Sequence, residues 1–97
     1  MNAELRQQIY TVVSRIPPGR VTSYGRIAGM TEGATARMVG AAMGNLPDGH
    51  GLPWHRVINA SGRIADHGGA QRQRLLLREE GIDIDNRTRV PARYFWP

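Results

Sequence analysis

The stretch Pro53–Val57 reads Pro-Trp-His-Arg-Val, and Ile58–Ile64 follows it directly with Ile-Asn-Ala-Ser-Gly-Arg-Ile. A rigid proline precedes an indole, an imidazole and a guanidinium, and an apolar run with a turn comes next. We predict that Arg56–Asn59 and Arg63–Ile64 pair as a β-hairpin around the turn Ala60–Gly62. This hairpin is the element around which the expected fold is arranged.

Helical periodicity is clearest at the start of the chain. Apolar residues recur at helical spacing over Leu5–Ile16, Asn2 can cap this segment, and Pro17–Gly19 ends it. The last expected helix covers Ala70–Glu80, with three partly buried leucines and a glycine directly after it. The tail that follows ends in Tyr-Phe-Trp, which we expect to pack back over the core.

Two further helices are expected between these segments, over Tyr24–Met30 and Ala34–Gly44, with Thr22 or Ser23 as the first cap and a break at Thr31–Gly33. The side chains expected to face inward are Ile27, Ala28, Met30, Val39, Ala42 and Met43. Two short helices joined by a glycine-containing turn are typical of a helix-turn-helix, and a hairpin after them is typical of a winged helix. We therefore expect a single domain over residues 1–97, mainly α with a small β-hairpin, of the winged helix-turn-helix type.

The helix expected over Ala34–Gly44 is rich in alanine and glycine. A glycine inside a helix costs about 1 kcal/mol relative to alanine, so close approach to another surface is expected here. That surface is either a neighbouring helix or a nucleic-acid groove. Arg37 projects from this thin helix, which suits a side chain that reaches into something, although a solvated arginine is the alternative.

Composition excludes several classes of chemistry. The chain has no cysteine, so disulfides, thiolate metal sites and a cysteine nucleophile are ruled out. Its three histidines, His50, His55 and His67, lack metal-binding spacing, so we expect no metal and no cofactor. No apolar run approaches the ~18 residues needed to cross a bilayer, and the N-terminus lacks a signal peptide. We therefore expect no membrane association and a cytoplasmic protein, nucleoid-associated if the source is bacterial.

The charge balance favours a polyanionic partner. The formal net charge is +5, and all 13 basic residues are arginine. Guanidinium groups bind phosphates in pairs of hydrogen bonds and stack on bases, which suits nucleic-acid binding. A bias in genome composition is the simpler explanation for the absence of lysine.

Five pieces of the chain occur in the order found in one known family: Pro18–Gly25, Ala36–Gly40, Asn45, Pro53–Val57 and Glu80–Gly81. Together they resemble the C-terminal DNA-binding and active-site domain of the O6-alkylguanine-DNA alkyltransferases. The resemblance covers most of the chain and implies that fold, without the family's separate N-terminal domain. It also implies that the helix-turn-helix docks in the minor groove.

The family transfers the alkyl group to a cysteine between the proline and the histidine, where this chain has Trp54. The sequence therefore resembles the alkyltransferase-like proteins. A thiolate is the effective nucleophile for such a transfer, and the indole nitrogen is only a hydrogen-bond donor. We expect no catalytic residue and no enzyme activity. The resemblance implies a monomeric sensor that binds O6-alkylguanine in double-stranded DNA, flips the nucleotide and recruits nucleotide excision repair proteins.

The resemblance also assigns roles to individual residues. Tyr24 would rotate the target nucleotide outward and Arg37 would fill the gap in the base stack. The other expected DNA-contacting residues are Thr22, Ser23, Thr35, Ala36 and Gly40. The expected lesion pocket consists of Pro53, Trp54, His55, Val57, Ile58 and His67. The expected structural hydrogen-bond network consists of Asn45, Arg56 and Glu80, with His55 also joined to Glu80.

Each role has a plainer alternative. Tyr24 could be a partly buried aromatic at a helix start, Trp54 an ordinary core tryptophan, and His67 a solvent-facing loop residue. At the level of function, the alternatives are a winged-helix transcriptional regulator without lesion specificity and a hydrolase that uses His55 and Glu80. A regulator would need base-reading side chains on the helix over Ala34–Gly44, which consists mainly of alanine, glycine and methionine.

Overall fold

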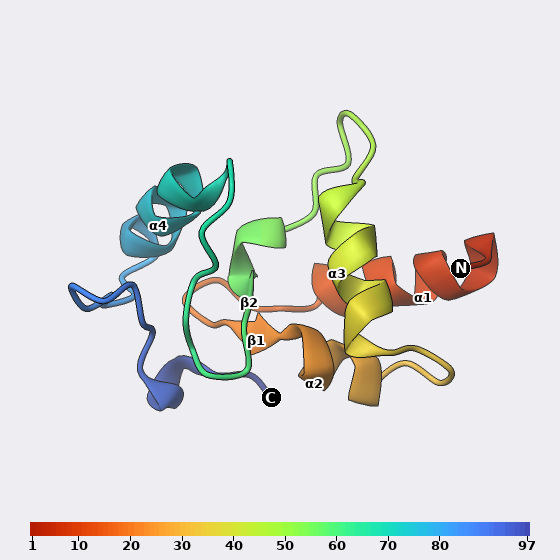
Figure 1. Ribbon diagram of the computed structural model, residues 1–97, viewed down its shortest axis with the longest axis horizontal. Helices are drawn as coiled ribbons and strands as arrows, with labels where there is room; N and C mark the ends of the chain where they lie inside the picture. Colours follow the sequence, from red (N-terminus) through yellow and green to blue (C-terminus); the bar gives the residue numbers. More distant parts are fainter.

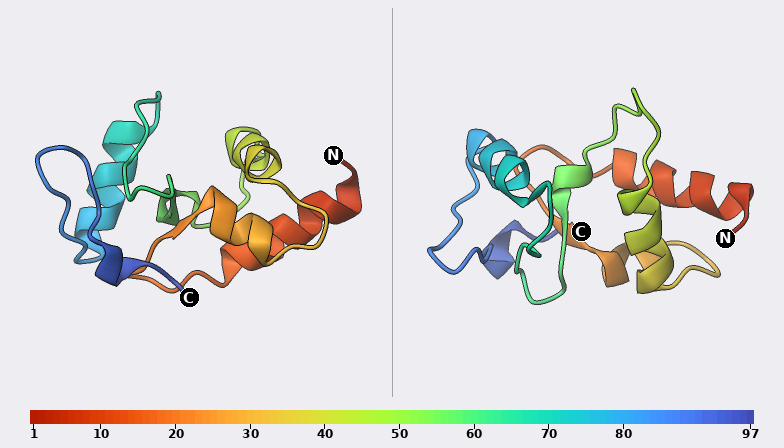
Figure 2. Two further views of the ribbon diagram at one scale, coloured as in Figure 1. Left: turned by 60° about the horizontal axis from the view of Figure 1, so that its bottom comes forward. Right: turned by 45° about the horizontal axis from the view of Figure 1, so that its top comes forward.

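The computed structural model describes all residues, Met1–Pro97. Three helices, α1 (Ala3–Ser14), α2 (Tyr24–Gly29) and α3 (Ala36–Gly44), form one side of the molecule, and α4 (Ala70–Glu79) lies on the other side (Figure 1). Two further views keep α4 apart from α1, with the strands between them (Figure 2). The four expected helices are therefore confirmed. None of them has both the length and the apolar character needed to cross a membrane.

Side-chain caps set where the first three helices begin. The Asn2 side chain accepts a hydrogen bond from the backbone N–H of Leu5 at 2.7 Å, as expected. Ser23 caps α2, while Thr35 caps α3, which starts two residues later than expected. Each cap satisfies an N–H group that has no partner inside its helix.

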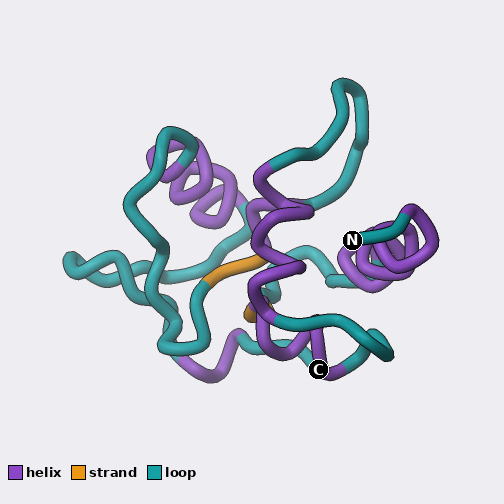
Figure 3. The backbone as a smooth tube through the Cα atoms, turned by 45° about the vertical axis from the view of Figure 1, so that its right-hand side comes forward, coloured by secondary structure: helices purple, strands orange, loops and turns teal.

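The sheet has only two short strands, β1 (Thr22–Ser23) and β2 (Val57–Ile58), which run parallel. Thr22 lies opposite Val57, and Ser23 lies opposite Ile58. All four residues are buried, so the sheet is covered on both faces, as is usual for parallel strands. Long loops flank α3 and lead into α4 around this small sheet (Figure 3).

The expected β-hairpin is wrong. The partner of β2 is β1, and Arg63 instead forms an isolated antiparallel bridge with Arg89 in the tail. A turn survives, because the Asn59 N–H donates to the Arg63 carbonyl at 3.2 Å and the Gly62 N–H donates to the Asn59 carbonyl at 2.9 Å. The physical reason is burial. Because β2 is apolar on both faces and lies in the interior, it needs a partner strand that is buried as well. A hairpin arm that faces solvent would not provide one.

The core consists of two apolar clusters. The first joins α1, α2 and α3 and contains Ile9, Val12, Val13, Ile16, Ile27, Val39, Ala42 and Val57. The second joins β2, α4 and the tail and contains Val21, Ile58, Ile64, Ala70, Leu77, Ile82 and Val90. Neighbouring residues of β2 enter different clusters, so this strand is where the two halves of the core meet.

The C-terminal tail packs back onto the molecule, as expected. It contains one short 3₁₀ helix, η2 (Ala92–Tyr94), and Phe95 forms an isolated parallel bridge with Val21. In this bridge the Val21 N–H donates to the Tyr94 carbonyl at 3.0 Å and the Trp96 N–H donates to the Val21 carbonyl at 2.7 Å. Two expected inward residues are exposed instead. Met30 is 39% exposed because it lies after the last residue of α2, and Leu75 is 55% exposed because it projects from the opposite face of α4 to Leu77.

A charged junction connects the two halves. The carboxylate of Glu80, at the end of α4, accepts hydrogen bonds from Arg56 at 2.7, 3.0 and 3.1 Å and from the Gly19 N–H at 2.9 Å. Its Oε2 atom also lies 2.7 Å from Nε2 of His55. Arg56 donates in addition to the carbonyl of Ile16 at 2.9 Å. The short 3₁₀ helix η1 (Trp54–Arg56) is thereby tied to the end of α1 and to α4.

Asn45 lies outside this junction, contrary to the expected network. Its side chain donates to the carbonyl of Ala41 at 2.8 Å and closes the last turn of α3. Asn45 is exposed, at the position that caps the C-terminus of that helix. It therefore shapes the end of α3 and takes no part in the contacts of Arg56 and Glu80.

The junction keeps Glu80 ionised well into the acid range. Burial raises the pKa of the Glu80 carboxyl, but the hydrogen bonds from Arg56, His55 and the Gly19 N–H outweigh it and lower the pKa to about 2. The folded-state pKa lies below the ordinary value of 4.5, so the carboxylate stabilises the fold above that pH. The stabilisation is lost as the pH falls from 4.5 towards about 2.

Replacing Glu80 with glutamine (Glu80→Gln) should lower the free energy of unfolding at neutral pH by about 2–3 kcal/mol, because Arg56 loses its counter-charge in a partly buried site. The difference from the parent chain should shrink as the pH falls from 4.5 to about 2. Urea unfolding at a series of pH values measures it, with exposed Glu79→Gln as the matched control. Parallel stability curves for the parent and the Glu80 variant would contradict the assignment.

Candidate nucleic-acid interface

An open pocket of about 280 Å³ lies between α3, the start of α2 and the loop before α4. Its lining residues are Tyr24, Gly40, Met43, Gly44, Trp54, Val57, Ala65, His67 and Gln73. A larger hollow of about 500 Å³ lies beside Arg63 and Arg74, but most of its lining residues are polar and it contains none of the expected site residues. The first pocket therefore best matches the sequence-based site.

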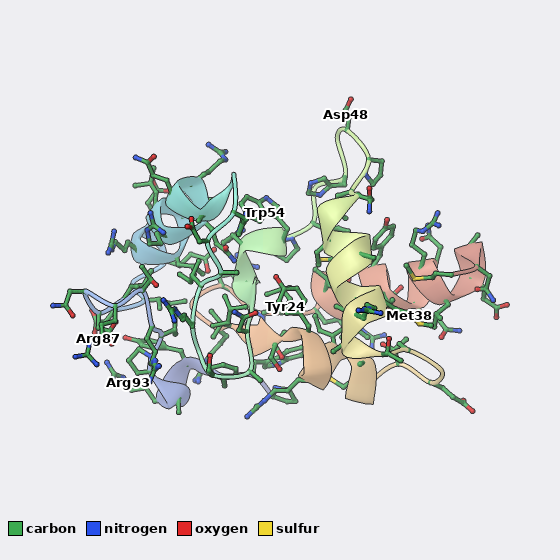
Figure 4. The ribbon with its side chains drawn as sticks, viewed as in Figure 1. Tyr24, Met38, Asp48, Trp54, Arg87 and Arg93 are labelled. Carbon is green, nitrogen blue, oxygen red and sulfur yellow. The ribbon has the colours of Figure 1, made fainter.

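The structure brings together part of the expected set. Trp54, Val57 and His67 line the pocket, and two of the expected DNA-contacting residues, Tyr24 and Gly40, line it as well. In Figure 4, Trp54 and Tyr24 both lie in the space between α3 and α4. The indole, the phenol and the imidazole therefore border one cavity.

Three expected pocket residues lie elsewhere. The His55 ring bonds to Glu80 in the junction, and Ile58 is 1% exposed within the second apolar cluster. Pro53 precedes η1 and is not part of the pocket lining. The reason is the turn of η1, which directs successive side chains to different sides, so only Trp54 of these neighbours reaches the pocket.

Sequence reasoning missed four lining residues: Met43, Gly44, Ala65 and Gln73. Met43 was expected to face the core, yet it is only partly buried. Gln73 is 3% exposed and shares the buried side of α4 with Ala70 and Leu77. The sequence did contain a sign of this role, because Gln73 is a polar residue in the apolar stripe of its helix. A buried amide needs hydrogen-bond partners, so its position could have predicted contacts with other segments.

Trp54 is not an ordinary core residue. It belongs to neither apolar cluster, is only partly buried, and meets the His55 ring edge to face, with ring centroids 6.1 Å apart and an angle of 82° between the planes. The His55 ring is in turn held by Glu80. The junction therefore supports one side of the indole while another side borders the pocket.

Tyr24 is the first residue of α2 and is partly buried against the first apolar cluster. Burial raises the pKa of its hydroxyl, so the phenol stays neutral and keeps its proton at physiological pH. The hydroxyl makes no hydrogen bond within the chain. A neutral phenol at the pocket edge is able to donate a hydrogen bond to an anionic group without charge repulsion.

The face of α3 beside the pocket is thin and open. A β-carbon added at Gly40 or Gly44 would meet no other atom within 4 Å. Packing against a neighbouring helix therefore does not explain these glycines.

Ala36 and Arg37 are exposed at the start of α3, and Arg37 makes no salt bridge. Met38 projects from the front of α3 in Figure 4, whereas Arg87 and Arg93 lie on the far side of the molecule.

Two expected DNA-contacting side chains are buried. Thr22 is 0% and Ser23 is 2% exposed, because both belong to β1. The Ser23 hydroxyl oxygen accepts the N–H of Arg26 at 3.1 Å, and the Thr22 hydroxyl has no partner. Neither side chain can reach a ligand while β1 is intact, so this expectation is corrected. Thr35 is exposed, and its oxygen accepts the Met38 N–H at 3.2 Å, which leaves the hydroxyl hydrogen free to donate.

No cluster of histidine, cysteine, aspartate and glutamate has the arrangement of a metal site. His50 is occupied by accepting the Leu52 N–H at 2.8 Å, and His55 by Glu80. The remaining imidazole, His67, bonds to Gln73 at 3.0 Å. The groups around the pocket are thus suited to binding through stacking, apolar contact and hydrogen bonds.

Comparison with known proteins identifies the family. A family model described as the DNA-binding domain of 6-O-methylguanine DNA methyltransferase matches residues 4–82. The chain is 45% identical over 92 residues to a DNA base-flipping protein of Vibrio parahaemolyticus, with 92% of each chain covered. It is 46% identical over 88 residues to alkyltransferase-like protein 1 of Schizosaccharomyces pombe, covering 84% of this chain and 79% of that one.

The fold agrees with these relatives. The crystal structure of S. pombe Atl1 in complex with damaged DNA containing O6-carboxymethylguanine matches with a TM-score of 0.86 and 35% identity, covering 100% of this chain and 98% of that chain. The crystal structure of Mycobacterium tuberculosis OGT in complex with DNA matches with a TM-score of 0.71 and 40% identity, covering 82% and 51%. The expected alkyltransferase C-terminal-domain fold is confirmed.

A methylated-DNA–protein-cysteine methyltransferase of Mycobacterium bovis is 37% identical over 91 residues, covering 92% of this chain and 52% of that one. Such enzymes need an acceptor cysteine, and this chain has none, with Trp54 at the corresponding place in the motif. The chain belongs to the family of the 6-O-methylguanine DNA methyltransferase DNA-binding domain, among the alkyltransferase-like proteins.

Proposed function

We propose that the chain recognises O6-alkylguanine in duplex DNA by rotating the damaged nucleotide into the pocket beside Trp54, and leaves the alkyl group in place. The observation that carries this proposal is the open face of α3, at Gly40 and Gly44, next to a pocket bordered by Tyr24 and Trp54. The names of its relatives support it, because one is a base-flipping protein and another was crystallised with O6-carboxymethylguanine DNA.

Docking would place α3 in the minor groove. The exposed residues at the start of this helix are small apart from Arg37, so the backbone is able to approach the groove closely. Minor-groove edges carry a degenerate base code, which a damage scanner tolerates. Thr35 and Ala36 would contact the DNA backbone, and the net charge of +5 makes phosphate contacts and salt-sensitive binding the expected behaviour.

Flipping would be easier at the lesion than elsewhere. Moving a base out of the stack costs a few kcal/mol, and less where pairing is already weak. O6-alkylation removes the N1 proton of guanine and blocks the O6 contact with cytosine, so the damaged pair starts weaker. Tyr24 would crowd the phosphate of the rotating nucleotide, while Arg37 would occupy the vacated space in the stack.

The pocket itself would then hold the base. Trp54 offers an apolar, polarisable surface to the alkyl group, and Val57, Met43 and Ala65 add apolar contacts. The lining has no thiolate, the effective nucleophile for an O-alkyl carbon, and the indole nitrogen of Trp54 only donates a hydrogen bond. The contacts in the pocket would therefore stabilise the everted nucleotide without altering it.

The hydrolase alternative is weakened by the junction. Glu80 has a pKa of about 2 and is surrounded by donors from Arg56, His55 and Gly19, so it is a very weak base. His55 faces Glu80 and does not line the pocket. The regulator alternative is weakened by α3, where Arg37 is the only exposed side chain long enough to read bases.

The wider role that we propose is a flag for nucleotide excision repair, with repair proteins as partners of the DNA complex. A protein that leaves the adduct in place completes no repair by itself, so a second activity must remove the lesion. We further propose that residues 1–97 act as one domain and as a monomer, in the cytoplasm and, in a bacterium, near the nucleoid.

The chain should bind a duplex with one O6-methylguanine more tightly than the unmodified duplex, by about 1–3 kcal/mol, the discrimination available at one base position. The methyl group should remain on the DNA. Fluorescence titration of Trp54 and Trp96 measures the affinities, and mass spectrometry of DNA and protein follows the methyl group. Equal affinities would favour a regulator, and an altered base would favour an enzyme.

Arg37→Ala should weaken binding to the lesion duplex by about 1–3 kcal/mol, because the side chain no longer fills the gap left by the flipped nucleotide. Arg87→Ala is the matched control, since Arg87 is an exposed arginine on the far side of the molecule from α3 (Figure 4). The same titrations apply. Similar losses in the two variants would remove the intercalating role from Arg37.

Gly40→Leu should raise the free energy of unfolding by about 0.5–1 kcal/mol, because glycine is unfavourable inside a helix and a β-carbon at this position meets no other atom within 4 Å. It should also reduce lesion binding, since the leucine side chain enters the pocket. Ala41→Leu is the control, because Ala41 is exposed on α3 and does not line this pocket. A stable Gly40 variant with unchanged lesion affinity would argue against this pocket.

A further inference from the structure

Gln73 is a buried polar residue whose position the proposed function does not by itself explain. It lies on α4 with 3% exposure, between Ala70 and Leu77, which both belong to the second apolar cluster. It also lines the pocket. A buried amide is costly unless its oxygen and nitrogen both find partners.

The amide nitrogen of Gln73 bonds to two backbone carbonyl groups in the segment that carries η1 and β2. Nε2 lies 3.1 Å from the carbonyl oxygen of His55 and 3.0 Å from that of Val57. Because carbonyl oxygens only accept hydrogen bonds, the NH₂ group must face them. The orientation of the amide is thereby fixed, and its oxygen faces the other way.

That oxygen, Oε1, lies 3.0 Å from Nε2 of His67. Because Oε1 is an acceptor, Nε2 of His67 must carry the proton. The other ring nitrogen, Nδ1, accepts the backbone N–H of Gly69 at 3.0 Å and therefore has a free electron pair. Both constraints are satisfied by one form of the ring, the neutral imidazole protonated on Nε2.

Both nitrogens of His67 are therefore occupied by the protein, although much of its ring is exposed at the pocket edge. The parts left for a flipped base are the ring face and the C–H edge. A β-carbon added at Gly69 would lie 3.1 Å from Cε1 of His67 and 3.5 Å from Cη2 of Trp54. The imidazole and the indole thus both border the space beside Gly69.

We propose that Gln73 is a positioning residue that holds His67 as a wall of the pocket and prevents it from hydrogen bonding to the base. The same amide also bonds to the carbonyl groups of His55 and Val57, which directly follow Trp54 in the chain. Selection of the damaged base at this end of the pocket then depends on its contact with the surface of the His67 ring. This inference rests on the proposed function, because it concerns the nucleotide that the pocket would hold.

The first test is the protonation of His67 in the full chain, measured by ¹⁵N NMR. The parent chain should show His67 as the Nε2–H tautomer alone. Gln73→Met, which matches the shape of glutamine without its hydrogen bonds, should shift the Nε2 signal and speed exchange of the Nε2 proton with water, because only the Gly69 N–H then holds the ring. Gln71→Met is the matched control, an exposed glutamine on the same helix, and should leave His67 unchanged. An unchanged Nε2 signal in Gln73→Met would overturn the proposal.

The second test uses binding. Gln73→Met should lower affinity for the O6-methylguanine duplex by about threefold to tenfold, the effect of losing a few ordinary hydrogen bonds, and should lower affinity for the unmodified duplex by less. His67→Phe keeps a ring surface but loses the hydrogen bond to Gln73, so its loss should resemble that of Gln73→Met. His67→Ala removes the ring as well and should lose more. If phenylalanine lost as much as alanine, the ring surface would contribute nothing to binding and the proposal would fail.

These outcomes separate the two proposals. Equal affinity of the parent chain for both duplexes would overturn the proposed function, and with it any role of Gln73 in lesion binding. A clear lesion preference that Gln73→Met fails to reduce would overturn the positioning role alone. If Gln73→Met unfolds, the comparison of His67→Phe with His67→Ala still decides the proposal.

Discussion

The carboxylate of Glu80 is the contact on which the arrangement of the pocket depends. It gathers the guanidinium of Arg56, the imidazole of His55 and the N–H of Gly19 at one point between the two apolar clusters. Without it, η1 would have little to hold its turn, since no side chain caps this short helix. Trp54 begins η1, so the ion pair places the pocket wall although the indole does not touch Glu80.

The junction has a structural role that needs no thiol. Its contacts are close, at 2.7 Å for both Arg56 and His55. Removing one member of a partly buried ion pair leaves an uncompensated charge, which is strongly destabilising. The presence of these residues is therefore no sign of catalysis.

Sequence patterns predicted the helices well because their signals are local. Asn2, Ser23 and Thr35 each supply a cap within three residues of the N–H they satisfy. The predicted strand pairing was wrong because β2 pairs with β1, from which α2 and α3 separate it along the chain. The sequence around β2 was equally compatible with a local hairpin turn. Gln73 was missed for a related reason: its partners, His55, Val57 and His67, come from separate segments that only the fold brings together.

The two sides of the pocket differ in a way that suits recognition without reaction. On one side, hydrogen bonds to the backbone hold His67 and Gln73, and the indole of Trp54 packs against the His55 ring of the junction. The other side, along α3, has glycines with open space beside them. A preorganised wall lowers the cost of ordering on binding, and an open groove admits the DNA backbone. If no covalent step ends the encounter, as proposed, the lifetime of the complex would be set by dissociation alone, and a repair partner would have that time to reach the lesion.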